Sequence, residues 1–189
     1  LTDRRYDVII NDADIPTHSG SAPMFAKEHF RNARDHLNPG GLVISKLHLA
    51  GISESSFRSI LGTFLEVFPH VTIWFPTTKP ISFYYLVGSR DRQLFSPRYI
   101  DETIGRESVR NSVAYLNFHN GFDVFSCYIG DETDIRRYLK EYHVNSDYTP
   151  YVEFNIEQHK HGMLDDIFPQ FMEKVRRNSL AGHIDFSGF

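Results

Sequence analysis

The stretch Arg5-Tyr6-Asp7-Val8-Ile9-Ile10-Asn11-Asp12 decides the fold class of this chain. Its apolar run, from Tyr6 to Ile10, is typical of a strand that lies inside a parallel sheet and is covered on both faces. An acidic loop follows it, beginning at Asp12. No other strand pattern and no glycine-rich turn precedes the run. We therefore interpret the chain as the second half of an α/β domain, with only part of a binding site.

Composition limits the classes of protein that the chain can belong to. Its 189 residues are 41% hydrophobic and 14% aromatic, which is enough for one domain with a buried core. The formal charge of -4 provides no basic stripe, so nucleic acid is not an expected partner. No apolar run approaches the roughly 20 residues that span a bilayer, and no membrane contact is expected. The single cysteine, Cys127, fits a cytoplasmic protein and excludes an intramolecular disulfide.

The spacing of apolar residues predicts alternating strands and helices in the first half. After the first strand we expect a helix that Ser21 caps and that runs to Leu37, a strand over 41–47, and a helix over 53–68. Two more strands, 70–75 and 81–88, are separated by too few residues for a helical crossover, so they should pair antiparallel as a hairpin.

The predicted fold class is therefore α/β. It is a partial Rossmann-like sheet of the methyltransferase type, made of trailing strands with a terminal antiparallel hairpin, and a mainly helical C-terminal extension follows it. Within that extension the pattern predicts short helices and two further strands. The helices are expected at 97–109, 131–142 and 163–178, and the strands at 122–129 and 147–156. We expect residues 1–90 to form the half-domain and residues 91–189 to pack on it as the extension.

Several motifs of the chain resemble those of the spermidine and spermine synthases, the polyamine aminopropyltransferases. That family has a strand Tyr-Asp-Val-Ile-Ile, an acidic loop Asp-x-x-Asp-Pro, a segment Leu-Phe-x-Lys-Glu and a helix end Leu-x-Pro-Gly-Gly. The resemblance covers residues 5–89 well and 145–154 loosely. The matching segments here are Tyr6-Asp7-Val8-Ile9-Ile10, Asp12-Ala13-Asp14-Ile15-Pro16, Met24-Phe25-Ala26-Lys27-Glu28 and Leu37-Asn38-Pro39-Gly40-Gly41.

The resemblance implies a reaction and a set of site residues. The family transfers an aminopropyl group from decarboxylated S-adenosylmethionine to a small-molecule amine, and no metal is expected. Asp12 would be the catalytic residue, because a carboxylate can hold the cationic amine and take its proton. Asp14, Lys46, Thr77 and Thr78 would bind the substrate.

The chain also departs from the family pattern. Asp12 and Asp14 are two positions apart, where the family has three, and Lys46 replaces a frequent glutamine. Thr78 replaces a tyrosine, and no Gly-x-Gly-x-x-Gly loop for a nucleoside occurs. Three functions therefore stay open: an aminopropyltransferase or its C-terminal fragment, a catalytically inactive binding or assembly module, and an adenosylmethionine-dependent methyltransferase-like protein. In the inactive case these residues are ordinary turn, loop and surface residues.

The first strand also bears on assembly. An unpaired strand exposes a row of backbone donors and acceptors, which proteins normally cover. We therefore expect the chain to associate, as a homodimer or with a second chain that completes the sheet.

Overall fold

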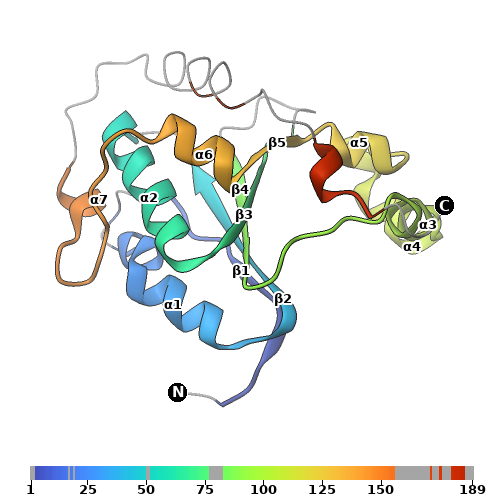
Figure 1. Cartoon of the computed structure of the whole chain (residues 1–189). Coiled ribbons are helices and arrows are strands. Elements are labelled where there is room, and N and C mark those ends of the chain that lie inside the picture. Colours follow the sequence, from blue (N-terminus) through green and yellow to red (C-terminus); the bar gives the residue numbers. More distant parts are fainter. Residues whose placement is uncertain are drawn as a thin grey trace.

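The sheet at the centre of the molecule has five strands in the order β1-β2-β4-β3-β5 (Figure 1). The computed structural model describes residues 3–16, 18, 20–49, 52–76, 83–155, 171, 175 and 180–185. The strands are β1 (Tyr6–Asn11), β2 (Leu37–His48), β3 (His70–Trp74), β4 (Phe83–Ser89) and β5 (Tyr128–Asp131).

The pairing of these strands confirms the predicted fold class. β1 and β2 are parallel, and β4 is antiparallel to both β2 and β3. β4 thus lies between two strands that run in the same direction. The antiparallel pairing of β3 with β4 confirms the predicted hairpin. The short connection between the two strands allows no other pairing. β5 adds an antiparallel strand beside β3, so the C-terminal extension contributes to the same sheet.

Helices lie on both sides of the sheet. α1 and α2 cover one side, α6 and α7 pack near α2, and α3, α4 and α5 lie on the other side (Figure 1). The bounds are η1 (Ala22–Phe25), α1 (Lys27–Asp35), α2 (Glu54–Val67), α3 (Pro97–Gly105), α4 (Glu107–Val113), η2 (Ala114–Leu116), α5 (Gly121–Phe125), α6 (Glu132–Tyr138), α7 (Tyr151–Phe154) and η3 (Leu180–His183). No helix among the described residues is long and apolar enough to span a membrane.

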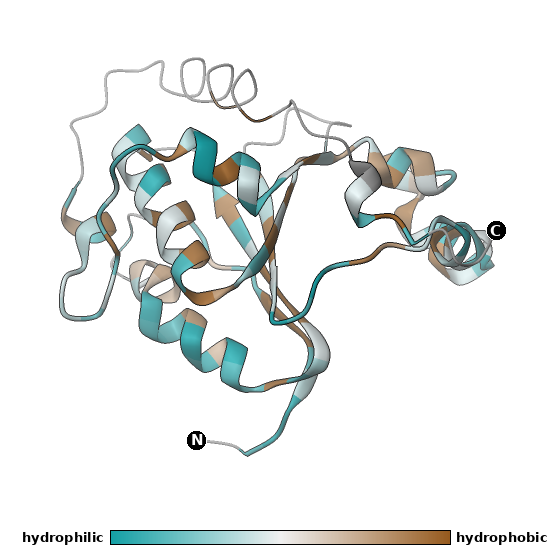
Figure 2. Cartoon of the chain, viewed as in Figure 1, coloured by the Kyte–Doolittle hydropathy of each residue, from teal (hydrophilic) through white to brown (hydrophobic). Residues whose placement is uncertain are grey.

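The main core lies between the sheet and helices α1 and α2. The ring of Phe64 contacts Phe30 and Phe68, at centroid separations of 4.9 and 4.5 Å. In Figure 2, apolar residues lie in the strands and along α2, whereas polar residues lie on the outer side of α1. Gly88 of β4 makes the close packing fit, since a Cβ there would lie 2.5 Å from the Phe68 ring.

The predicted helix from Ser21 to Leu37 is wrong in detail. The chain forms η1 and then α1, separated by Ala26 in an extended conformation, and the Ser21 side chain caps neither. The amide of Lys27 donates to the carbonyl of Asn145 at 2.9 Å, which anchors the start of α1. Leu37 already belongs to β2, so the strand begins four residues earlier than predicted.

The predicted strands of the extension are also corrected. Segment 122–129 contains α5 before β5 begins, because Asn120 and Asp123 form a capping box that starts a helix. The described part of segment 147–156, residues 147–155, contains the short helix α7 and no strand. The helix predicted over 163–178 lies almost entirely outside the described residues.

β1 is the edge strand of the described sheet, whereas the sequence favoured an interior strand. Its side chains Tyr6, Val8 and Ile10 are 42%, 48% and 65% exposed. β2 is its one neighbour among the described strands. The expected association through this edge stays a prediction.

Candidate functional site

A cavity of about 700 Å³ lies between the sheet and the segment that carries α3, η2 and α5. Alternate residues of β1, β2 and β4 form its floor, because side chains two apart on a strand share one face. Aromatic and aliphatic side chains dominate its surface. The floor contains Ile10, Leu42, Ile44, Lys46, Phe83, Tyr85 and Val87, and the other lining residues are Asp12, Trp74, Pro76, Phe95, Ile100, Tyr115, Leu116, Phe118, Val124 and Cys127.

Asp12 and Lys46 meet at this cavity. Asp12 follows the last residue of β1, and Lys46 lies near the end of the parallel strand β2, so both come from the carboxyl ends of neighbouring strands. Their side chains form an ion pair in which Asp12 is 70% exposed and Lys46 is 23% exposed. The Lys46 ammonium also lies 5.7 Å from the centroid of the Phe83 ring. In open α/β sheets, the carboxyl ends of strands are where ligands usually bind.

The buried side chain of Asn11 positions Asp12. Its amide nitrogen donates to the carbonyl of Met24 at 2.9 Å and to the hydroxyl of Ser45 at 3.2 Å. Its oxygen accepts from the amide of Ala13 at 3.2 Å, which makes a local turn after the strand. Successive side chains at the end of the strand point to opposite faces of the sheet, so Asn11 points to the core and Asp12 points to the cavity. Asn11 was not among the site residues predicted from the sequence, although asparagine at a strand end favours a turn.

The aromatic wall of the cavity is held in place by contacts between rings and by one hydrogen bond. The ring centroids of Trp74 and Phe95 are 5.3 Å apart at an interplanar angle of 89°, and those of Phe83 and Tyr85 are also 5.3 Å apart. The indole of Trp74 donates to the hydroxyl of Thr72 at 2.8 Å. Burial raises the pKa of the Tyr85 phenol above its ordinary value.

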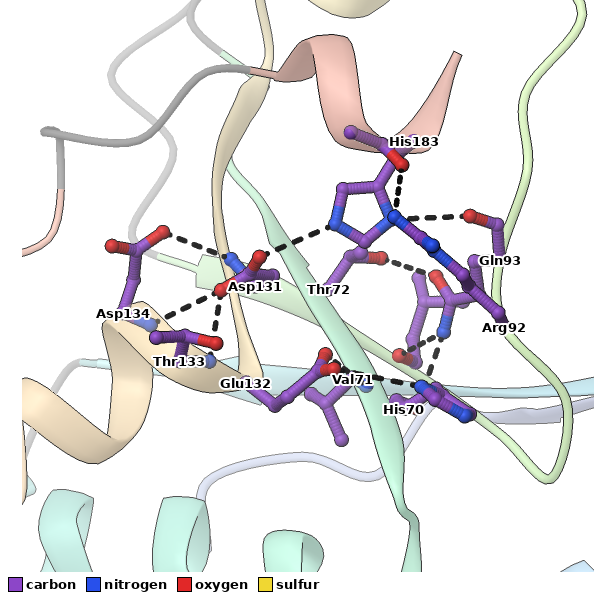
Figure 3. A network of polar contacts seen from close by, with 12 residues as sticks. His70, Val71, Thr72, Arg92, Gln93, Asp131, Glu132, Thr133, Asp134 and His183 are labelled. Carbon is purple, nitrogen blue, oxygen red and sulfur yellow. Dashed lines mark hydrogen bonds and ion pairs between the residues drawn. The ribbon is translucent and has the colours of Figure 1, made fainter. Parts of the chain in front are cut away.

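The Thr72 hydroxyl that accepts from the indole belongs to a polar network with Gln93, His183 and Asp131 (Figure 3). The Thr72 hydroxyl donates to the Gln93 side chain at 2.6 Å, and the Gln93 amide donates to the carbonyls of Val87 and His70. The imidazole of His183 lies 3.1 Å from the Gln93 carbonyl and 3.4 Å from the Asp131 carboxylate. These bonds join β3, β4, β5 and η3, so we interpret the network as the support that orients Trp74.

The structure places the predicted catalytic residue and the predicted substrate-binding residues differently relative to the cavity. Asp12 and Lys46 come together at the cavity, whereas Asp14 is exposed and does not line it. Thr77 and Thr78 lie outside the described residues, next to Pro76, which does line the cavity. Among the described residues, no group of three or more His, Cys, Asp or Glu side chains could hold a metal ion.

Comparison with solved structures gives a distant similarity. No family model matches the sequence, and no curated protein matches it. Among solved structures, the chain is similar to a probable spermidine synthase from Corynebacterium glutamicum, with 20% identity and a TM-score of 0.48. The match covers 86% of this chain and 52% of that one, so the chain spans about half the length of this neighbour. The assignment of the fold rests on the strand order described above.

Proposed function

We propose that this chain carries the amine-acceptor site of an aminopropyltransferase-type domain. The observation that supports the proposal is the position of Asp12, whose carboxylate follows a strand end and lies at the mouth of the cavity. The sequence motifs that resemble the aminopropyltransferases surround the same residue. The sequence has no glycine-rich loop for a nucleoside, and we assign only the acceptor side to this chain.

The role of Asp12 follows from the chemistry of the acceptor. An alkylamine is mostly protonated at neutral pH, and a carboxylate can hold the cation and then take a proton. In the transfer, the amine nitrogen forms a bond to the aminopropyl carbon of the sulfonium donor. The carbon–sulfur bond breaks, its electron pair stays on sulfur as methylthioadenosine, and the proton lost from nitrogen goes to Asp12.

A second candidate function is a noncatalytic amine-binding or assembly module. The ion pair with Lys46 favours it, because the ammonium already occupies the carboxylate that would receive an amine. In that case the cavity would still bind ligands, but the donor would not be consumed.

A turnover experiment separates the two functions. Because the chain lacks a glycine-rich loop that would hold the donor, the assay supplies decarboxylated S-adenosylmethionine in large excess over the 189-residue chain. A series of primary amines is added, and methylthioadenosine is measured by chromatography. We expect amine-dependent release, which Asp12→Asn lowers about 100-fold or more, as for the loss of a general base. Glu102→Gln removes an exposed carboxylate that pairs with Arg98 outside the cavity, and it should leave the rate unchanged. Release that is independent of Asp12, or amine binding without release, would reject the transfer reaction.

A further inference from the structure

The side chain of Lys46 marks where the ammonium group of a ligand can lie. Lysine ends in a primary alkylammonium, which here contacts the Asp12 carboxylate near the ring of Phe83. A carboxylate and the face of an aromatic ring are both favourable partners of such a group. An incoming amine must therefore displace Lys46 from Asp12, and it needs further contacts to compete with an ammonium that is part of the chain.

The charges at the cavity do not favour a linear diamine. Asp12 is the one carboxylate among the described lining residues, and Lys46 balances its charge. A diamine carries two positive charges at neutral pH and meets no net attraction there. Its second ammonium would meet no second carboxylate among the described lining residues, only the faces of aromatic rings, which compensate incompletely for the loss of water around a charged group.

The rest of the lining favours a flat apolar body. The rings of Trp74, Phe83, Tyr85 and Phe95 line the cavity together with Ile44. Aromatic side chains attract other rings in edge-to-face or offset arrangements, and burial of apolar surface is favourable in itself. The volume of about 700 Å³ falls within the range of sites for small organic ligands.

We infer that the amine taken by this cavity is an arylalkyl monoamine, whose ammonium replaces that of Lys46 at Asp12 and whose ring lies among the aromatic side chains. The inference rests on the proposed function in one respect, namely that Asp12 receives the amine. It concerns binding and does not depend on turnover.

The only tryptophan of the chain provides the measurement. Trp74 lines the cavity, so a ligand that enters should change its fluorescence. The probes are 2-phenylethylamine, 1,4-diaminobutane and 2-phenylethanol, which has the ring without the charge. We expect 2-phenylethylamine to bind at least tenfold more tightly than either of the others.

Two variants test the role of the carboxylate. In Asp12→Asn the affinity for 2-phenylethylamine should fall to that for 2-phenylethanol, whereas Glu102→Gln should bind like the unaltered chain. Calorimetry should show a negative heat-capacity change, the signature of apolar burial.

The outcomes of this experiment are distinct from those of the turnover assay. If 1,4-diaminobutane binds as tightly as 2-phenylethylamine, or if neither changes the fluorescence nor gives heat, the inference is wrong. Tight binding of 2-phenylethylamine without methylthioadenosine release would support the inference and reject the transfer reaction. Release with 1,4-diaminobutane, together with weaker binding of 2-phenylethylamine than of 1,4-diaminobutane, would support the transfer reaction and reject the inference.

Discussion

The ammonium of Lys46 contacts the carboxylate of Asp12 across two parallel strands, directly beside the ring of Phe83. The mouth of the cavity therefore contains one charge of each sign, held by residues that the sheet brings together from positions 34 apart in the sequence. Because Lys46 balances the charge of Asp12, the mouth of the cavity does not attract cations strongly.

Removal of the lysine charge should strengthen the binding of amines. In Lys46→Met the alkyl chain is kept and the competing ammonium is lost, so Asp12 is free to pair with a ligand. An exposed ion pair is typically worth about 1 kcal/mol or less, which predicts up to a fivefold gain in affinity. The gain should be larger for 1,4-diaminobutane than for 2-phenylethylamine, because the mouth becomes net negative.

Lys27→Met, which removes an ion pair with Glu66 outside the cavity lining, is the matched control in a fluorescence titration. Equal affinities in the two variants would show that Lys46 does not compete with ligands.

Ser21, which precedes η1, and Ser53, which precedes α2, should differ in how much their hydroxyl groups contribute to the stability of the fold. Ser53 is buried, and its hydroxyl accepts from the amide of Ser56 at 3.1 Å, which caps α2. Ser53→Ala should lower the free energy of unfolding by about 1 kcal/mol, the usual value of an N-cap. Ser21 makes no such bond, so Ser21→Ala should change it by less than about 0.5 kcal/mol. Urea denaturation measures both, and similar values for the two variants would contradict the assignment of the cap.

These two serines also show how far the sequence could predict the fold. Both precede an apolar helical pattern, and local sequence does not distinguish them. The periodicity correctly identified β1, β2, α2, β3 and β4, because each is a continuous apolar pattern bounded by turn residues. It failed for α5 and α7, which are only five and four residues long and are fixed by capping and tertiary contacts.

The candidate site was predictable only in part. The family resemblance assigned Asp12 and Lys46 to one site, and they meet because both lie at the carboxyl ends of neighbouring parallel strands. The position of the cavity over the sheet depends on α3, η2 and α5, whose packing no local pattern predicts. The roles of Trp74 and Gln93 likewise depend on contacts between segments that are far apart in the sequence.

Gly88 should tolerate no side chain. A Cβ at this position would lie 2.5 Å from Phe68 and 2.8 Å from Phe64, inside a close-packed core. Gly88→Ala should therefore destabilise the fold by about 1–3 kcal/mol, as overpacking usually does. Gly105, at the end of α3, has no atom within 4 Å of such a Cβ. Gly105→Ala should be neutral or stabilising by up to about 1 kcal/mol. Denaturation midpoints compare the two, and an unchanged midpoint for Gly88→Ala would contradict the described packing of β4 on α2.

The exposed edge of β1 predicts association. Tyr6, Val8 and Ile10 are apolar and exposed, and a strand edge offers backbone groups to another strand. We propose that a second copy or another chain pairs there. Light scattering should show a mass that rises with protein concentration, and Val8→Lys should reduce it. Phe122→Lys, at an exposed apolar residue of α5, should not reduce it. A monomer at every concentration would reject association of copies through β1.

Stability should decrease as the solution becomes acidic, in part because of His29. Burial lowers the pKa of its imidazole, and the carboxylate of Asp147 opposes this effect more weakly. The unfolded chain therefore binds a proton more readily than the folded protein, at a pKa of about 6.5. Above that pKa the imidazole is neutral in both states, and its contribution to stability is fully present. This contribution is lost as the pH falls from that value toward the lower pKa of the folded state.

His29→Gln should flatten this part of the stability profile, measured by urea denaturation between about pH 5 and pH 8. His119→Gln, at an exposed histidine, should keep the slope of the unaltered chain. A profile that is equally steep in both variants would exclude His29 as its source.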